Sequence, residues 1–428
     1  MEEAYIILNT IWAAIRNWWW VILPFVLWRP FLFLWLWWRK EMWNAQQKAI
    51  ILEVKIPRDV LKPLKAMEQV MASIWGGVFD PPDWWEKWIE GKTQISVSFE
   101  IVSLGGEVHL YLRTVNVLRN TIESCIYAEY PDAEISIVDD YVKNVPRDMP
   151  NKEWDMWGAN IKLLRDDIYP IRTYAKFFEE KTEPKEEKRI DPMATLFEGL
   201  GRLGPGEQMW IQIIAFPVTN VENNYVDRGK DLVGKMLSRE KEEKPKSIVQ
   251  EATEDLVFGL QEKKKEETTF RLAELQLSPG EREIVSSVEN KIGAYVFETV
   301  MRFIYLGEKD VFFKPQIKSA FAFFAQFDTA NLNGFKPWPE TITKIKKKWF
   351  LPMNLFIQRR LYLRKRRLFR NYIKRFSPFW PKLKGPFILS NEEMATIFHF
   401  PGQISAPAPS VQRVEAKKGD APSTLPIE

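Results

Sequence analysis

The chain has 428 residues, 46% of them hydrophobic, and a formal net charge of +4 at pH 7. That length allows two or three domains with hydrophobic cores. The single cysteine, Cys125, excludes an internal disulfide framework, and with only His109 and His399 beside it the chain has too few soft ligands for a zinc site. We therefore expect a reducing compartment, and a buried, structural Cys125 thiol.

The first predicted element is the apolar run at residues 18–38, in which only Pro24, Arg29 and Pro30 are not apolar. The run is long enough to cross a bilayer core as a helix, so we expect an N-terminal transmembrane helix within a membrane anchor at residues 1–45. Two alternatives stay open: a hairpin whose two arms meet at a break at Arg29-Pro30, or a segment lying in the membrane interface. The anchoring tryptophans are Trp18, Trp19, Trp20, Trp28, Trp35, Trp37 and Trp38.

Charges on either side of this run predict its orientation. Arg39 and Lys40 follow it, whereas Glu2, Glu3 and Arg16 precede it, so positive charge is in excess on the C-terminal side. This pattern predicts a single-pass protein of the inner membrane with a cytoplasmic body. No small-residue cleavage site follows the run, so we expect it to be retained rather than removed as a signal peptide.

Residues 46–150 are predicted to form a first ferredoxin-like αβ domain. The periodicity indicates a strand at 50–56, a helix at 61–75, a hairpin at 94–103 and 107–114, a helix at 117–130 and a strand at 133–138. The resulting order βαββαβ is that of a split βαβ unit.

Residues 151–340 are predicted to form a second αβ domain of the same type. Its elements are a strand at 160–164, a helix at 192–203 and a strand at 208–217, followed by a strand and a helix at 294–305 and 314–327. Runs of Lys and Glu at 220–292 indicate a charged helical insertion between them. The predicted fold class is therefore α+β, with a transmembrane helix, two ferredoxin-like units, a basic segment at 341–402 and a disordered tail at 403–428.

No motif predicts an enzyme or a cofactor site. Gly199, Gly201 and Gly204 match GxGxxG, but they are expected to close a helix and lead into a strand, the reverse of a dinucleotide-binding context. The chain contains no GxxxxGK[ST] phosphate loop. His109 lies in an alternating strand and is expected to be a surface or paired residue rather than a base.

The charge distribution is more informative. Residues 341–390 hold 15 Lys or Arg and no Asp or Glu, which leaves the rest of the chain at −11, since the total is +4. Three interpretations stay open: anionic lipid headgroups, which need the fewest assumptions beside an anchor, nucleic acid phosphates, or acidic groups of the same chain. The expected polyanion-binding residues are Lys346, Lys347, Lys348, Arg359, Arg360, Arg364, Lys365, Arg366, Arg367, Arg370, Lys374 and Arg375.

Six stretches together resemble a domain of unknown function common in Patescibacteria: ILEVKIPRDVLKP (51–63), AMEQVMASIW (66–75), IYAEYPDAEI (126–135), GEQMWIQIIAFP (206–217), NLNGFKP (331–337) and FILSNEEMATIFHFPG (387–402). Similar N-terminal regions occur in membrane-anchored proteins of the conjugative or type IV secretion class. There, a segment like the last stretch leads into a coupling-type ATPase. The matching positions are Leu389, Ser390, Glu392, Glu393, Met394, Ala395, Thr396, Ile397, His399 and Pro401.

The resemblance implies a non-catalytic, membrane-anchored accessory or scaffold protein of a conjugation-like or DNA-translocation assembly. The implied partners are a lipid bilayer, a separate translocation ATPase, and further copies of the chain. The alternative is a membrane-tethered nucleic-acid-binding protein that uses the basic segment 344–375.

Overall fold

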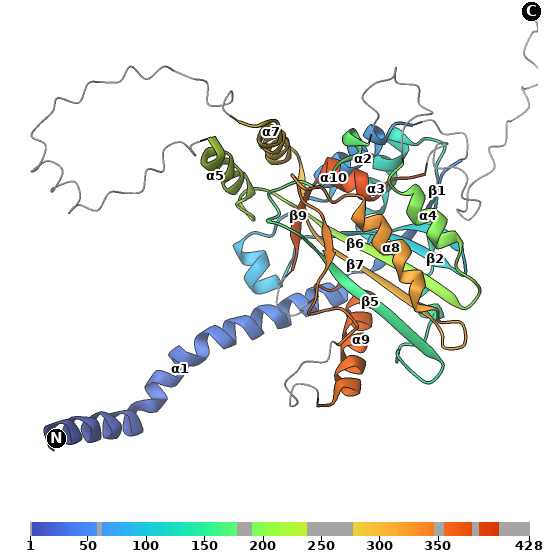
Figure 1. Ribbon diagram of the computed structural model, residues 1–428. Coiled ribbons are helices and arrows are strands. Elements are labelled where there is room, and N and C mark those ends of the chain that lie inside the picture. Colours follow the sequence, from blue (N-terminus) through green and yellow to red (C-terminus); the bar gives the residue numbers. More distant parts are fainter. Residues whose placement is uncertain are drawn as a thin grey trace, which may run out of the picture.

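The computed structural model describes residues 2–57, 62–177, 191–237, 277–345, 355–378 and 385–401. In this part of the chain, nine strands form one antiparallel sheet in the order β4-β1-β3-β2-β6-β7-β5-β8, and β9 pairs with β7 (Figure 1). The sheet and its helices confirm the predicted α+β class.

The first half of the sheet has the strand order β4-β1-β3-β2. Its elements are β1 (Ala49–Lys55), α2 (Leu64–Val78), β2 (Val97–Leu104), β3 (Glu107–Val115), α3 (Arg119–Glu129) and β4 (Glu134–Val138). Gly105 and Gly106 make the β2–β3 turn at φ values of 61° and 99°, which favour glycine over residues with a Cβ. The chain order βαββαβ expected for this half is present.

The second half has the order β6-β7-β5-β8, which repeats the first half in reverse. Its elements are β5 (Trp154–Leu163), α4 (Ala194–Gly201), β6 (Glu207–Val218), β7 (Val296–Glu308), α8 (Ile317–Ala325) and β8 (Phe335–Pro337). The two halves join edge to edge through β2 and β6, from the pair Val97–Ala215 to the pair Leu104–Gln208. Both halves therefore share one continuous sheet.

The insertion between β6 and β7 begins and ends as helix. α5 (Tyr225–Leu237) and α7 (Pro279–Gly293) pack together through Val233, Val285 and Val288, beside the start of β7 at Val296. A capping box at Ser278 and Glu281 begins α7.

The two faces of the sheet are covered differently. The larger core lies between one face and α2, α3, α4, α8 and α10 (Asn391–Ile397), which gather on that side in Figure 1. α9 (Ile357–Ile373) packs on the opposite face. After α9 the chain returns as β9 (Phe387–Ser390), and α10 packs against α2, where the Asn391 side chain donates to Glu68 Oε1 at 3.3 Å.

Five short helical segments complete the described secondary structure. They are η1 (Glu86–Glu90), a π-helix, and four 3₁₀ turns: η2 (Asn116–Leu118), η3 (Tyr141–Asn144), η4 (Tyr174–Lys176) and η7 (Lys314–Gln316).

The N-terminal segment forms one helix, α1 (Glu2–Gln46), which extends away from the sheet (Figure 1). Within the described residues, no helix has both the length and the mean hydropathy needed to cross a membrane. The expected transmembrane helix is therefore wrong, as are the single-pass inner-membrane localisation and the membrane classification built on it. The run at 18–38 is rich in tryptophan, whose indole N–H lowers its hydropathy, and it includes Pro24, Arg29 and Pro30.

The glycine motif has the structural role expected from its context. Gly199 and Gly201 lie at the end of α4, and Gly204 precedes β6, where its N–H donates to Glu207 Oε2 at 3.0 Å. A Cβ on Gly199 would approach the Cβ of Ser319 to 2.5 Å, so this glycine allows α4 and α8 to pack closely. The prediction of a helix end and turn is confirmed.

Candidate functional site

The helix α9 is amphipathic, with its charge on the outer side. At about 100° per residue, its exposed cationic positions occupy about 120° of the helix circumference. These six residues, termed here the basic face, are Arg359, Arg360, Arg366, Arg367 and Arg370 of α9 and Lys374, which caps its C-terminal end. Arg359 and Arg370 are about 16 Å apart along the axis at 1.5 Å per residue. No acidic residue occurs in α9.

The opposite side of α9 is anchored in the sheet. Leu368, Phe369 and Tyr372 are buried and pack against Trp210, 5.3 Å from the Tyr372 ring, in a second core. Gly158 of β5 permits this approach, because a Cβ there would lie 2.8 Å from Cδ2 of Leu368. The basic face is therefore held in a fixed orientation outward from the sheet.

A buried ion pair fixes the C-terminal end of α9. Arg375 Nε and Nη2 each donate to Glu100 at 3.0 Å, and Nη1 donates to Asp140 at 2.7 Å. Glu100 also accepts from Ser98 Oγ and Tyr141 OH, both at 2.7 Å. Burial would raise the pKa of Glu100, but the charge and hydrogen bonds of Arg375 outweigh it and lower the pKa to about 2.

Glu100 belongs to a row of polar residues at one level of the sheet. In strand order, the row is Glu53, Tyr111, Glu100, Gln212, Arg302 and Asn160, each directly opposite the next in the ladder. Directly opposite residues of antiparallel strands point to the same face. The row therefore lies on the face that α9 covers.

The row contains polar atoms without partners among the described residues. Arg302 is fully buried and donates through Nη2 to the carbonyl oxygen of Phe376, but its Nε and Nη1 have no partner. Burial lowers the pKa of Arg302 to about 9. The side-chain oxygens of Gln212 and Asn160, on either side of it, also lack partners there. Unpaired buried polar atoms are rare in folded proteins and call for an explanation.

A cleft of about 310 Å³ opens at the Asn160 end of this row. It lies between α9 and the segment at 338–343, and its polar lining includes Asn160, Thr341, Arg360, Arg364, Arg367 and Asn371. Two hydrogen bonds join the segment at 338–343 to β5. Thr341 Oγ1 accepts from the Asn160 N–H at 3.1 Å, and Thr343 Oγ1 accepts from the Gly158 N–H at 2.9 Å. Glu340 and the apolar residues Leu363, Leu368 and Pro378 complete the lining, so the cleft carries three cationic side chains and one acidic one.

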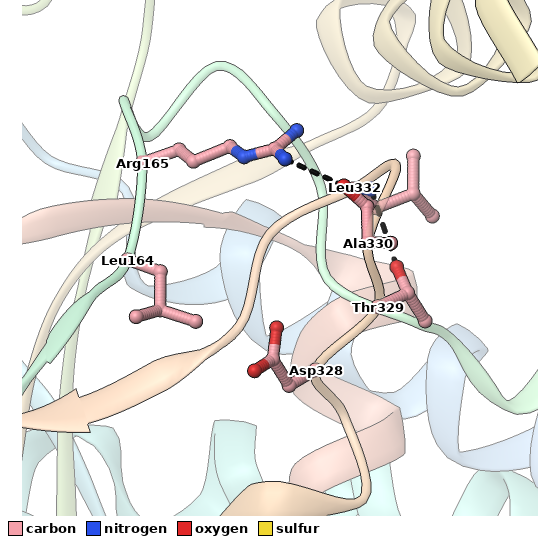
Figure 2. Close-up of a pocket in the computed structure, with 6 residues that line it drawn as sticks. All are labelled: Leu164, Arg165, Asp328, Thr329, Ala330 and Leu332. Carbon is pink, nitrogen blue, oxygen red and sulfur yellow. Dashed lines mark hydrogen bonds between the residues drawn. The ribbon is translucent and has the colours of Figure 1, made fainter.

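A second, larger cavity of about 410 Å³ lies beside the loop at 328–332 (Figure 2). Arg165 reaches across it, as Figure 2 shows, and donates from Nη1 to the Asn331 carbonyl at 2.8 Å and from Nη2 to the Ala330 carbonyl at 2.5 Å. Its guanidinium is therefore engaged in holding the loop.

The expected polyanion-binding residues separate into three groups. The basic face brings six of them together. Lys365, Arg364 and Arg375 instead make contacts within the chain: Lys365 to Asp155 at 2.5 Å, Arg364 Nη1 to the Ile342 carbonyl at 3.2 Å, and Arg375 to Glu100. Lys346, Lys347 and Lys348 lie outside the described residues.

The tryptophans of α1 are only partly described. Trp28, Trp37 and Trp38 are exposed, whereas Trp35 donates from Nε1 to the Trp88 carbonyl in η1 at 2.9 Å. The guanidinium of Arg39 lies 6.0 Å and 5.8 Å from the rings of Trp35 and Trp38. The side chains of Trp18, Trp19 and Trp20 lie outside the described residues.

The two histidines and the cysteine have structural contacts. His109 Nδ1 lies 2.6 Å from Glu53 Oε1, which confirms the expected pairing. His399 is buried, with Nε2 2.9 Å from Asp191 Oδ1. Cys125 is half-buried against the main core, and burial raises the pKa of its thiol. Among the described residues, no group of His, Cys, Asp or Glu is arranged to hold a metal ion.

The stretch FILSNEEMATIFHFPG is built into the fold. Ser390 and Glu393 form a capping box that begins α10. Glu393 is fully buried and pairs with buried Lys291 at 2.9 Å, and its Oε1 accepts from the Ile171 N–H at 2.8 Å. These residues join β9 and α10 to the rest of the protein rather than forming a reactive site.

Sequence reasoning missed Glu100, Asn160, Gln212 and Arg302 as a connected set. In an alternating strand, a polar residue between apolar ones is expected to face solvent. That rule fails for all four residues, because each of them is buried. The available signal was that four separate strands each carry one such residue at their middle.

Comparison with known proteins gives a family without a described activity. A family model described as a domain of unknown function, DUF8128, matches residues 41–405. No curated protein matches the chain. The matched residues contain the whole sheet, α9 and the cleft, and leave out most of α1.

Proposed function

The chain belongs to the DUF8128 family, and we propose that it is a non-catalytic, nucleic-acid-binding protein whose contact element is the basic face of α9. The observation that carries this proposal is the collection of six exposed cationic side chains on one side of a helix that lacks acidic residues. Regularly spaced cations on a rigid support suit a phosphate backbone.

The charge of the remaining chain supports the same choice. Outside residues 341–390 the chain carries −11, so a polyanion is repelled by most of the protein and attracted to the α9 side. Because the ion pair of Arg375 and the packing of Leu368 fix α9, the helix that carries the cations need not reorder on binding.

Exposed aromatic rings favour strands with unpaired bases. Phe356, immediately before α9, is 72% exposed, and Tyr362 within α9 is 38% exposed. Aromatic rings beside a basic groove stack on unpaired bases without regard to sequence. The basic face together with these two rings therefore predicts binding to both double-stranded and single-stranded DNA. Stacking on unpaired bases is expected to add affinity for single strands.

The salt dependence of binding tests the proposal directly. Contact of all six cations with duplex phosphates gives a slope of log Kobs against log salt of about −5, or a loss of about 10³ in affinity between 50 and 200 mM salt. The measurement is fluorescence anisotropy of the full chain with a labelled 30-base-pair duplex. A slope near zero would remove the proposal.

Charge variants locate the contact. R366Q/R370Q should reduce the slope by about 2, since two phosphate contacts are lost. The matched control is K230Q/K235Q, which removes two exposed lysines from α5 and should leave the slope unchanged. An equal reduction of the slope by R366Q/R370Q and by K230Q/K235Q would show that binding depends on the overall charge of the protein and not on contacts with α9.

The resemblance to secretion-type proteins adds a finer part to the proposal. We infer that the chain serves a DNA-translocation or conjugation-like assembly of a Patescibacterial cell as an accessory or scaffold protein beside an ATPase partner. Its support is the set of stretches quoted above, of which the last forms β9 and α10. Affinity purification from the native cell tests it; recovery of an intact complex containing no ATPase would contradict it.

A further inference from the structure

The two ends of the sheet differ in how their backbone groups are used. At the β5 end, the segment at 338–343 closes the edge: the Trp338 N–H donates to the Asn160 carbonyl at 2.7 Å, and the Thr343 N–H donates to the Gly158 carbonyl at 3.1 Å. β8 ends in Pro337, which has no N–H to donate. At the other end, the outer edge of β4 has no hydrogen-bond partner within the described residues. The open end of the described sheet is therefore β4.

β4 also lacks the features that usually protect an edge strand. It contains no Lys, Arg, Pro or Gly, and its one charged residue is Glu134 at the first position. Natural edge strands are commonly protected by such residues, by a bulge or by a covering segment. Ile137, near the end of the strand, is 49% exposed. An edge of this kind is suited to pairing with a strand of another molecule.

The sequence of β4 is complementary to itself. Ile135, Ser136 and Ile137 read the same in both directions. In an antiparallel pair centred on Ser136, each Ile135 lies opposite Ile137 of the second copy on one face. The two copies of Ser136 lie opposite each other on the other face. Such a pair covers the exposed side of Ile137 with another isoleucine, and it has the two-fold symmetry of most homodimers.

Charges on either side of β4 favour the antiparallel arrangement. Asp132 and Glu134 are exposed at its start, so this flank is acidic. At its end, the two aspartates that directly follow β4 are paired with Lys143 and Arg375, and exposed Arg147 lies beyond them. In an antiparallel pair, the acidic flank of each copy lies beside the end that carries Lys143 and Arg147 in the other copy, so opposite charges approach each other. A parallel pair would bring the two acidic flanks together.

From these observations we propose that the chain forms a two-fold symmetric dimer through β4, with antiparallel pairing centred on Ser136. The nine-stranded sheets of the two copies then continue as one. The contact uses one short strand from each copy, which is less than the roughly 800 Å² per partner of a standard interface. We therefore expect a reversible dimer with a Kd on the order of 10 μM.

The dimer places both basic faces on the same side of the joined sheet. Paired strands keep one face of the sheet continuous, so the face that carries α9 in one copy continues into the same face of the other. α9 packs against Trp210 of β6, four strands from β4. At about 4.8 Å per strand, the two α9 helices lie roughly 45 Å apart if the sheet twist is neglected. The inference goes beyond the proposed function, which needs one basic face, because it gives a long duplex two contacts.

Disulfide cross-linking tests the pairing. C125S removes the one native cysteine, and S136C adds a thiol at the centre of the pair. Antiparallel pairing there puts the two Cα atoms about 4.5–5.5 Å apart, within the range of a disulfide. We expect mild oxidation at 100 μM protein to convert most of C125S/S136C to a covalent dimer, whereas C125S/K230C, with its thiol on the exposed side of α5, should stay monomeric. Equal cross-linking of the two variants, or none at S136C, would overturn the inference.

Sedimentation velocity of the full chain from 1 to 200 μM measures the dimer without a cross-link. I137K places a lysine on the edge and should weaken the dimer at least tenfold. V311K is the matched control, since Val311 is an aliphatic residue with 42% exposure outside β4, and it should leave the dimer unchanged. Tryptophan fluorescence and urea unfolding check that both variants fold. A chain that stays monomeric at 200 μM, or a dimer weakened equally by I137K and V311K, would overturn the inference.

Duplex length separates this inference from the proposed function. A 30-base-pair duplex is about 100 Å long and reaches both basic faces, whereas a 10-base-pair duplex of about 34 Å reaches one. I137K should weaken binding of the long duplex several-fold and leave binding of the short one unchanged. An equal effect on both lengths would overturn the placement of the two basic faces on one side.

Failure of the inference and failure of the proposed function give different results. If the proposed function fails and the inference holds, neither duplex binds, while the dimer still sediments and still cross-links through S136C. If the inference fails and the function holds, the chain stays monomeric, while the duplex binds with its steep salt dependence.

Discussion

Replacing Arg375 with methionine leaves the Glu100 carboxylate buried without its main partner. Glu100 is fully buried, and Arg375 supplies two of its hydrogen bonds. Removal of one member of a buried ion pair costs about 3–5 kcal/mol, because the other charge remains unpaired. We expect R375M to lower the free energy of unfolding by an amount in this range at pH 7.

The pKa of Glu100 gives an independent scale for this loss. A pKa lowered from the ordinary 4.5 to about 2 corresponds to about 3 kcal/mol. Because the folded-state pKa is the lower one, this stability is fully present above about pH 4.5 and is lost as the pH falls toward 2. In R375M the burial of Glu100 is no longer offset, so the pKa of Glu100 rises, and the variant should become less stable as the pH increases.

Chemical denaturation at several pH values, followed by tryptophan fluorescence, measures both effects. The double variant R375M/E100Q serves as the control, since it removes the unpaired charge and should recover a large part of the loss at pH 7. A loss below 1 kcal/mol for R375M, or a double variant no more stable than R375M, would refute the assignment of Glu100 and Arg375 as a coupled pair.

Three further predictions concern stability and reactivity. K291M should destabilise the protein by about 3–5 kcal/mol, since it leaves the charge of buried Glu393 without its cationic partner. K143M breaks a fully exposed pair with Asp139 and should leave the free energy of unfolding nearly unchanged. Equal losses for the two variants in urea unfolding would contradict this. G158A should destabilise by about 1–3 kcal/mol, because its Cβ would meet the Phe303 carbonyl oxygen at 2.6 Å, while G76A in α2, with nothing within 4 Å, should be neutral or stabilising by up to about 1 kcal/mol in the same assay. Cys125 should react with a thiol reagent more slowly than free cysteine at pH 7, and faster as the pH rises, because burial raises its pKa; rapid labelling of the native protein at pH 7 would argue against its burial.

The regular elements could be predicted because their periodicity is local. The alternation around Phe99 and Leu112 gave the central hairpin, and Met67, Val70 and Met71 gave the buried face of α2. β8 is only three residues long, too short for a period, and was not predicted. β5 was predicted only at residues 160–164 because Gly158 interrupts the apolar pattern before them.

The site could be predicted only in part. The density of Arg and Lys in α9 is visible in sequence, but the separation of exposed Arg366 from buried Arg375 depends on what the helix packs against. Glu100 and Arg375 are 275 residues apart in sequence and 3.0 Å apart in space. The N-terminal helix was overinterpreted because the many aromatic residues of the run were counted as fully apolar.

The contact between α2 and α10 also has a consequence during protein synthesis. Met67 and Met71 of α2 share a core with Met394 and Ile397 of α10, which follow about 330 residues later. At about 5–20 residues per second, the ribosome takes about 15–60 s to add that length. The part of the native cover of α2 that α10 supplies is therefore absent until long after α2 has left the ribosome, whereas α3 follows it closely. Because β9 also completes the sheet beside β7, the last step of folding has to wait for the end of the matched region of the chain.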